Sequence, residues 1–211
     1  FIDHDITLNP DGDELVMIDI PAGDAFFDPQ SRGNVQIPMR RTAPMPGTGD
    51  SASNPRNHVN HITSYIDGSG VYGSDEERAS WLRTFIGGKL KVSSGNLLPY
   101  NTVNRERHSI IAPNAPEMDN PVGLTERLFV AGDVRANENP LLLSFHTLFV
   151  REHNLLCDEL ALRYPHWEDE ELYQYARKMV GGMIQSITYN EWLPVMGINI
   201  PAYAGYRPNI N

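Results

Sequence analysis

The stretch LFVAGDVRANENPLLLSFHTLFVREHN, residues 128–154, decides the fold. It opens with a short apolar run, breaks at Gly132, and offers Asn137 and Asn139 as helix caps ahead of Pro140. Apolar residues then recur at steps of three and four, which predicts one long helix with a broad apolar face. They are Leu141, Leu142, Phe145, Leu148, Phe149, Leu155 and Leu156. Only a large core can bury such a face, so we predict that this helix is central.

Arg135 and Glu138 stand just ahead of that helix. A guanidinium and a carboxylate three residues apart can be a plain structural ion pair or part of a functional site. Spacing alone does not separate these two interpretations.

Composition bounds the classes of function. The chain has 211 residues, of which 40% are hydrophobic and 21% charged, as expected for one globular domain. Its net charge of -10 disfavours nucleic acid as a partner. We find no apolar run long enough for a membrane span. Cys157 is the one cysteine, and its leucine neighbours predict a buried structural thiol.

Two further segments carry polar residues in suggestive patterns. Asp3, His4 and Asp5 are consecutive, although such a triplet alone is more often a solvated surface cluster. Residues 63–69 form a glycine-rich stretch in which oxygen-bearing residues alternate. In an extended loop, alternate residues can direct oxygens at one point, and oxygen ligands favour calcium over zinc. On spacing alone a simple turn remains the commoner explanation.

The run AGDVRANENPLLLSFHTLFVREHN resembles the signature of the animal-type haem peroxidases, in the peroxidase–cyclooxygenase superfamily. The resemblance implies a mainly α-helical domain with long loops and little β structure. Residues 1–211 would be the distal, N-terminal part of that one catalytic domain. Arg135 would lie over the distal face of haem b, and Glu138 could form an ester link to the haem. Asn139 replaces a Met that makes a second kind of haem link in some members, so that link is not expected.

The same resemblance assigns roles to the other two segments. Asp3 would form a second ester to the haem, and His4 would be the distal base. The calcium ligands would be Asp5, Thr63, Tyr65, Asp67 and Ser69.

The implied reaction is reduction of hydrogen peroxide, with oxidation of halides, pseudohalides or small aromatic donors through a ferryl intermediate. A neutral imidazole such as that of His4 can move the peroxide proton, and a fixed guanidinium such as Arg135 can stabilise charge on the leaving oxygen. A secreted or periplasmic site suits a calcium-loaded peroxidase. Two alternatives stay open. One is a cyclooxygenase-like fatty-acid dioxygenase, and the other is a non-catalytic, calcium-stabilised interaction module.

The resemblance also implies a proximal histidine that ligates the iron. After Arg135 the sequence offers His146 and His153 on the predicted helix, which we interpret as packing residues, and His166 in a predicted turn. We therefore expect the remainder of the catalytic domain, with the proximal His, to lie downstream, and residues 1–211 alone to be inactive.

The rest of the chain is predicted from turn and helix signals. Residues 10–55 are rich in proline and glycine and predict an irregular region with two short strands. Gly95 and Asn96 predict a small hairpin. The predicted strands span residues 15–20 and 35–37, and the further helices span residues 56–65, 75–85 and 168–188.

Overall fold

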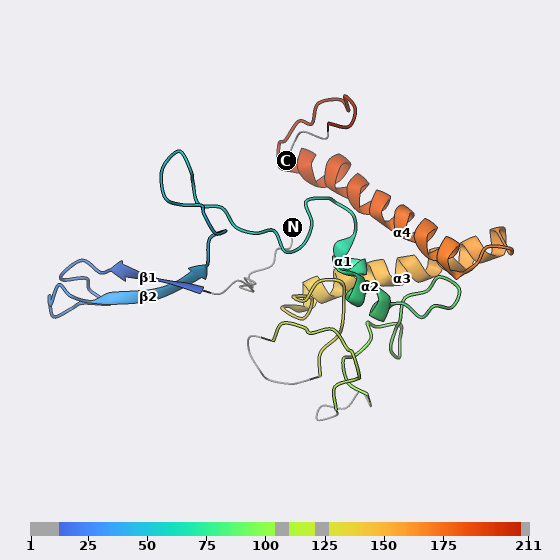
Figure 1. The fold of residues 1–211 in the computed structure, drawn as a ribbon, viewed down its shortest axis with the longest axis horizontal. Helices are drawn as coiled ribbons and strands as arrows, with labels where there is room; N and C mark the ends of the chain where they lie inside the picture. The colour runs from blue at the N-terminus through green and yellow to red at the C-terminus, as the bar shows by residue number, and fades with distance from the viewer. Residues whose placement is uncertain (1–12, 104–109, 121–126, 208–211) are drawn as a thin grey trace. The chain divides into compact units, whose positions relative to one another are not determined.

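A computed structural model describes residues 13–103, 110–120 and 127–207. Among the described residues helices are the main regular structure, loops are long and the sheet has two strands, which confirms the predicted fold class (Figure 1). The chain divides into two compact units, Ile6–His61 and the remainder. Asp3, His4 and Asp5, the segment with the predicted distal base, lie outside the described residues.

The smaller unit is built on an antiparallel hairpin of β1 (Asp13–Asp19) and β2 (Gln36–Thr42), with Val16 opposite Met39. Two strands were predicted here, and both are longer than the sequence indicated. The connection between them is closed by Asp28, whose carboxylate accepts hydrogen bonds from the backbone of Arg32 (2.9 Å) and Gly33 (2.8 Å). These bonds hold the pKa of Asp28 below its usual range.

The predicted helix at residues 56–65 is wrong, because that segment is irregular. The carbonyl of Asn57, which a helix would use four residues later, instead accepts the amide of Met45 at 2.8 Å. The hydroxyl of Thr63 donates to Asp67 and accepts from the amide of Tyr65. Such local side-chain hydrogen bonds compete with the backbone hydrogen bonds of a helix. The first helix therefore begins later, at Ser69.

The larger unit contains the long helices. Asn139 caps α3 (Pro140–Arg163) by accepting from the amides of Leu141 and Leu142, which confirms the predicted start. α4 (Asp169–Ser186) begins where a helix was predicted, and the structure adds a reciprocal capping box between Glu168 and Glu171 at its start. The other helices are α1 (Ser69–Tyr72), α2 (Glu76–Leu82), η1 (Ile187–Trp192) and α5 (Leu193–Val195).

The predicted apolar face of α3 is correct only in part. Leu142 and Leu156 are buried, but Leu141, Leu148 and Leu155 each expose more than half of their surface. The buried residues of α3 instead form a mixed stripe containing polar side chains. This stripe comprises Leu142, His146, Thr147, Val150, His153, Leu156, Cys157 and Leu160.

A hydrogen-bonded aromatic cluster joins α1, α3 and α4. The Nε2 of His153 lies 2.8 Å from the Gly88 carbonyl, so Nε2 is the protonated nitrogen. Nδ1 can then accept from the Tyr72 hydroxyl at 2.9 Å, and the Tyr173 ring packs edge-on against both. Burial, aided by nearby Arg83 and Arg177, lowers the pKa of His153 to about 4. His153 is therefore a neutral packing histidine, as predicted.

Cys157 lies beside this cluster and is fully buried, which confirms its prediction as a structural thiol. Burial raises its pKa to about 12. A thiol held in this protonated form is a poor nucleophile and a poor metal ligand.

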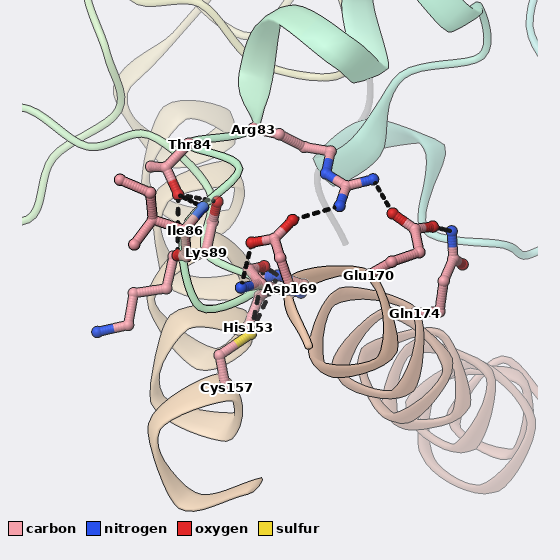
Figure 2. A network of polar contacts seen from close by, with 10 residues as sticks. Arg83, Thr84, Ile86, Lys89, His153, Cys157, Asp169, Glu170 and Gln174 are labelled. Carbon is pink, nitrogen blue, oxygen red and sulfur yellow. Dashed lines mark hydrogen bonds and ion pairs between the residues drawn. The ribbon is translucent and has the colours of Figure 1, made fainter. Parts of the chain in front are cut away.

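A polar network fixes the loop after α2 to the first turn of α4 (Figure 2). The Arg83 guanidinium pairs with Asp169 at 2.8 Å and Glu170 at 2.6 Å, and lies 3.8 Å from the centre of the Tyr173 ring. The other oxygen of Asp169 accepts the Gly88 amide at 2.6 Å. Asp169 thereby fixes Gly88, whose carbonyl accepts the hydrogen bond from His153.

The predicted hairpin at Gly95 and Asn96 is a tight turn with a single bridge between Ser93 and Leu97 rather than two strands. No helix in the described ranges of the chain is both long and apolar enough to cross a membrane.

Candidate functional site

Arg135 lies in the loop of residues 131–138, which leads from a buried extended segment into α3. Its Nε donates to Asp133 Oδ1 at 2.9 Å and its Nη2 to Oδ2 at 2.7 Å, so the carboxylate grips one edge of the guanidinium fork. The Arg135 amide also donates to Asp133. Only 17% of the Arg135 side chain is exposed. The fork is therefore held in one orientation, by a residue that the sequence interpretation missed.

The start of this loop is held by Arg78 of α2. Its guanidinium is buried and donates to the carbonyls of Ala131 (3.0 Å) and Glu117 (2.7 Å). Burial lowers the pKa of Arg78, but an arginine remains charged at any physiological pH. Nothing in its sequence context marks Arg78 for this role.

Gly132 permits close packing of this loop on α1. Its amide donates to the Gly70 carbonyl at 3.1 Å. A Cβ atom at this position would lie 2.2 Å from the carbonyl oxygen of Ser69 and 2.6 Å from the amide nitrogen of Gly73. The glycine in the AGD run is thus required by backbone contact and not by an unusual dihedral angle.

The Gly70 carbonyl also accepts from Nδ1 of His146, at 2.8 Å. One oxygen therefore joins three segments, namely α1, the loop that carries Arg135, and α3. The prediction that His146 is a hydrogen-bonded packing histidine is confirmed.

The end of the loop is fixed just before α3. The side chain of Asn137 pairs with both backbone groups of Phe129, at 3.0 and 2.7 Å. Asn137 was considered as a helix cap, but Asn139 takes that role. The half-buried Glu138 follows, with its amide donating to the Arg135 carbonyl at 2.9 Å. Arg135 and Glu138 thus belong to one well-anchored turn.

In the predicted calcium loop, two residues donate hydrogen bonds to the carboxylate of a third, Asp67. Asp67 accepts from the Thr63 hydroxyl at 3.1 Å and from the Ser69 amide at 3.0 Å. Tyr65 is exposed, and its amide donates to the Thr63 hydroxyl. This set supplies hard oxygens from hydroxyl, carbonyl and carboxylate groups, which suits calcium. In the described residues no three His, Cys, Asp or Glu side chains gather as a metal cluster.

A cavity of about 370 Å³ lies between this loop and α3. One wall is formed by residues 65–71 and the other by apolar side chains of α3, with Ile184 of α4. His146 lines the cavity as well as holding Gly70. The structure thus brings the candidate calcium loop and the Arg135 loop onto one shared framework.

Comparison with known proteins supports a single family. The model of the animal haem peroxidase family matches residues 1–211. Dual oxidase 2 of Rattus norvegicus is 40% identical over 196 residues, covering 92% of this chain. The dual oxidase of Drosophila melanogaster is 36% identical over 200 residues. The chain spans 13% of the length of each of these relatives.

Solved structures also superpose on the chain. Peroxidase A from Dictyostelium discoideum superposes with a TM-score of 0.71 at 34% identity, covering 93% of this chain and 39% of its own. A fatty acid alpha-dioxygenase from Oryza sativa superposes with a TM-score of 0.57 at 25% identity, covering 90% of this chain and 25% of its own. Because the family model matches residues 1–211, the chain belongs to the animal haem peroxidase family.

Proposed function

We propose that the protein is a haem peroxidase that reduces hydrogen peroxide and oxidises a small donor, such as a halide, a pseudohalide or an aromatic compound. The observation that carries the proposal is the fixed guanidinium of Arg135, gripped by Asp133 in a loop anchored at both ends. A preorganised cation stabilises developing negative charge without reorganising during the reaction. A guanidinium held in this way suits a distal haem pocket.

The chain's own residues would divide the work as follows. The imidazole of His4 would take a proton from one peroxide oxygen and return it to the other. Arg135 would stabilise the charge on the departing oxygen. Haem b, when bound, supplies the two electrons that cleave the oxygen–oxygen bond.

Asp3 and Glu138 are proposed as ester partners of the haem, and the chain offers a direct test. Asp3→Val and Glu138→Gln should each make the haem of the full-length protein more extractable into acidified butanone. If the double variant and the parent release haem equally, there is no ester link.

The proximal iron ligand is proposed to be a histidine outside residues 1–211. His146 and His153 are engaged with backbone carbonyls, and His166 is exposed in the turn between α3 and α4. The remainder of the catalytic domain would supply this ligand.

The function is tested on the full-length, haem-loaded protein by its Soret absorption and by peroxide-dependent oxidation of iodide, thiocyanate and guaiacol. Arg135→Lys should lower kcat by about a hundredfold or more, because the bidentate fork is lost. Arg163→Gln, an exposed change at the end of α3, is the matched control and should retain parental activity. Equal turnover by Arg135→Lys and the parent would contradict the role of Arg135.

The fatty-acid dioxygenase alternative is kept because of the superposition with the Oryza sativa enzyme. It predicts consumption of O₂ with a fatty acid and little oxidation of the three donors. The interaction-module alternative predicts neither reaction, even in a haem-loaded protein.

A further inference from the structure

A second cavity, of about 560 Å³, lies between the 84–96 loop and α3. It shares no lining residue with the Arg135 loop or with the candidate calcium loop. Figure 2 shows three residues of its wall, Thr84, Ile86 and Lys89, beside the Arg83 network.

The walls of this cavity are built and held by side-chain hydrogen bonds. Asn154 of α3 pairs with both backbone groups of Leu90, at 2.8 and 3.0 Å. Arg151, one turn earlier, donates to the carbonyls of Asn96 (2.8 Å) and Gly95 (2.9 Å). These four bonds tie the loop to α3 at two places, so the cavity exists before any ligand arrives.

The charged groups of the lining favour an anion. Lys89, Lys91 and Arg151 contribute three cations, whereas Asp158 is the one carboxylate and pairs with Lys89 at 2.6 Å. The chain carries a net charge of -10, so this local excess of positive charge is opposite in sign to the charge of the whole molecule.

Lys91 and Arg151 are held here by neutral groups. The ammonium of Lys91 donates to the carbonyl of Trp81 and lies 4.4 Å from the centre of the Trp81 ring. Arg151 is held by the two carbonyls named above. Burial lowers the pKa of Lys91, the direction expected for a partly desolvated ammonium. A ligand carboxylate would supply the negative charge that these partners do not.

Four apolar side chains also line the cavity, beside the polar Thr84, Asn96 and Asn154. Ile86, Leu90 and Val92 come from the loop, and Leu155 comes from α3 with more than half of its surface exposed. An inorganic anion would leave this apolar surface in water, and a neutral apolar molecule would make no use of the cations. The lining therefore matches a molecule that has both a carboxylate and an apolar body.

We propose that this cavity is a binding site for a small amphiphilic carboxylate, with the carboxylate near Lys91 and Arg151 and the apolar body against the exposed side chains of Ile86 and Leu155. The site is separate from the proposed peroxidase chemistry and does not depend on it.

The first test is a calorimetric titration of the full-length protein with octanoate and, separately, with 1-octanol, below their aggregation concentrations. Octanoate should bind with at least about tenfold higher affinity, because only the carboxylate can pair with the cations. Added NaCl should weaken octanoate binding by screening the charges. Equal affinity for the two molecules would overturn the proposal.

The second test places binding at this cavity. Lys91→Met and Arg151→Met keep apolar stems but remove one charge each, and each should weaken octanoate binding about tenfold. Lys178→Met, an exposed change on α4, is the control and should leave the affinity unchanged. Arg151→Lys keeps the positive charge but loses the guanidinium that holds the loop. It should therefore bind octanoate more tightly than Arg151→Met does. Octanoate binding that neither methionine variant weakens would show that the ligand binds elsewhere.

Discussion

At the scale of single residues, the site depends on close backbone contact. The Gly70 carbonyl accepts from both Gly132 and His146, so the Arg135 loop approaches α1 as closely as two backbones can. Polar side chains then define orientations within this packing, as Asp133 does for the guanidinium of Arg135. A small change in this backbone contact would therefore move the guanidinium of Arg135.

Gly132→Ala should destabilise the fold by about 3 kcal/mol, because its Cβ would overlap the Ser69 carbonyl, a backbone atom that cannot rotate away. Gly182→Ala is a matched control in α4, where a Cβ meets nothing within 4 Å. The control should be neutral or stabilising by up to about 1 kcal/mol. Urea unfolding of both variants measures the difference, and similar stabilities would refute the steric argument.

His153 should make stability depend on pH. Its pKa is about 4 in the folded protein against 6.5 ordinarily, so between these values the unfolded chain binds a proton that the folded chain does not. Stability is therefore lost as the pH falls from 7 toward 4, by up to about 3 kcal/mol from this group.

The measurement compares His153→Gln, which can keep both hydrogen bonds but does not titrate, with the parent at pH 7.5 and 4.5. The variant should lose less stability on acidification than the parent. His58→Gln, an exposed change in the smaller unit, should behave like the parent. Parallel losses in parent and His153→Gln would mean that His153 is not buried in neutral form.

At the scale of elements, helix starts are the features that local sequence determines best. The side chain of Asn139 accepts from the amides of Leu141 and Leu142, which have no carbonyl partner within the helix. Both partners lie within three residues of Asn139, so the local sequence is enough to predict this cap. Asn139→Ala should cost about 1 kcal/mol, and Asn139→Ser should restore most of it. Thermal unfolding followed by circular dichroism at 222 nm tests this, with no difference between Ala and Ser as the contrary result.

The starts of α3 and α4 were predictable for this reason, whereas the face that α3 buries was not. Periodicity predicted which apolar residues of α3 share one face, but whether that face is buried depends on the elements that pack against the helix. Leu148 is exposed here, while the polar His153 is fully buried because Tyr72 and Gly88 supply partners from distant parts of the chain. The helix prediction for residues 56–65 was wrong for a similar reason, because the Asn57 carbonyl accepts a hydrogen bond from the distant amide of Met45.

At the scale of the whole molecule, the site combines segments that lie far apart in sequence. The motif in residues 131–139 identified Arg135 and Glu138, but no local pattern indicates Arg78 as their support. Alternation in residues 63–69 identified the Asp67 cluster, and the structure adds its link through Gly70 to the Arg135 loop. Long-range contacts of this kind follow from tertiary packing and not from spacing.

We propose that calcium joins Asp5 to the 63–69 loop, as the family resemblance implies, and it should then stabilise the domain by mass action. At a hundredfold excess over its Kd the gain is about 3 kcal/mol, so a chelator should lower the Tm of the full-length, haem-loaded protein. Asp67→Asn should largely remove this effect, while Glu159→Gln, an exposed change on α3, should preserve it. An unchanged melting curve on chelation would exclude the site.

The Tyr72–His153–Gly88 chain has a consequence for proton exchange. Tyr72 and His153 are both fully buried, so their hydroxyl and ring hydrogens can reach water only when the packing of α3 and α4 opens locally. In a magnetic resonance spectrum these two hydrogens should persist as slowly exchanging signals. Their exchange rates would measure how often the packing between α3 and α4 opens, and no label would have to be introduced.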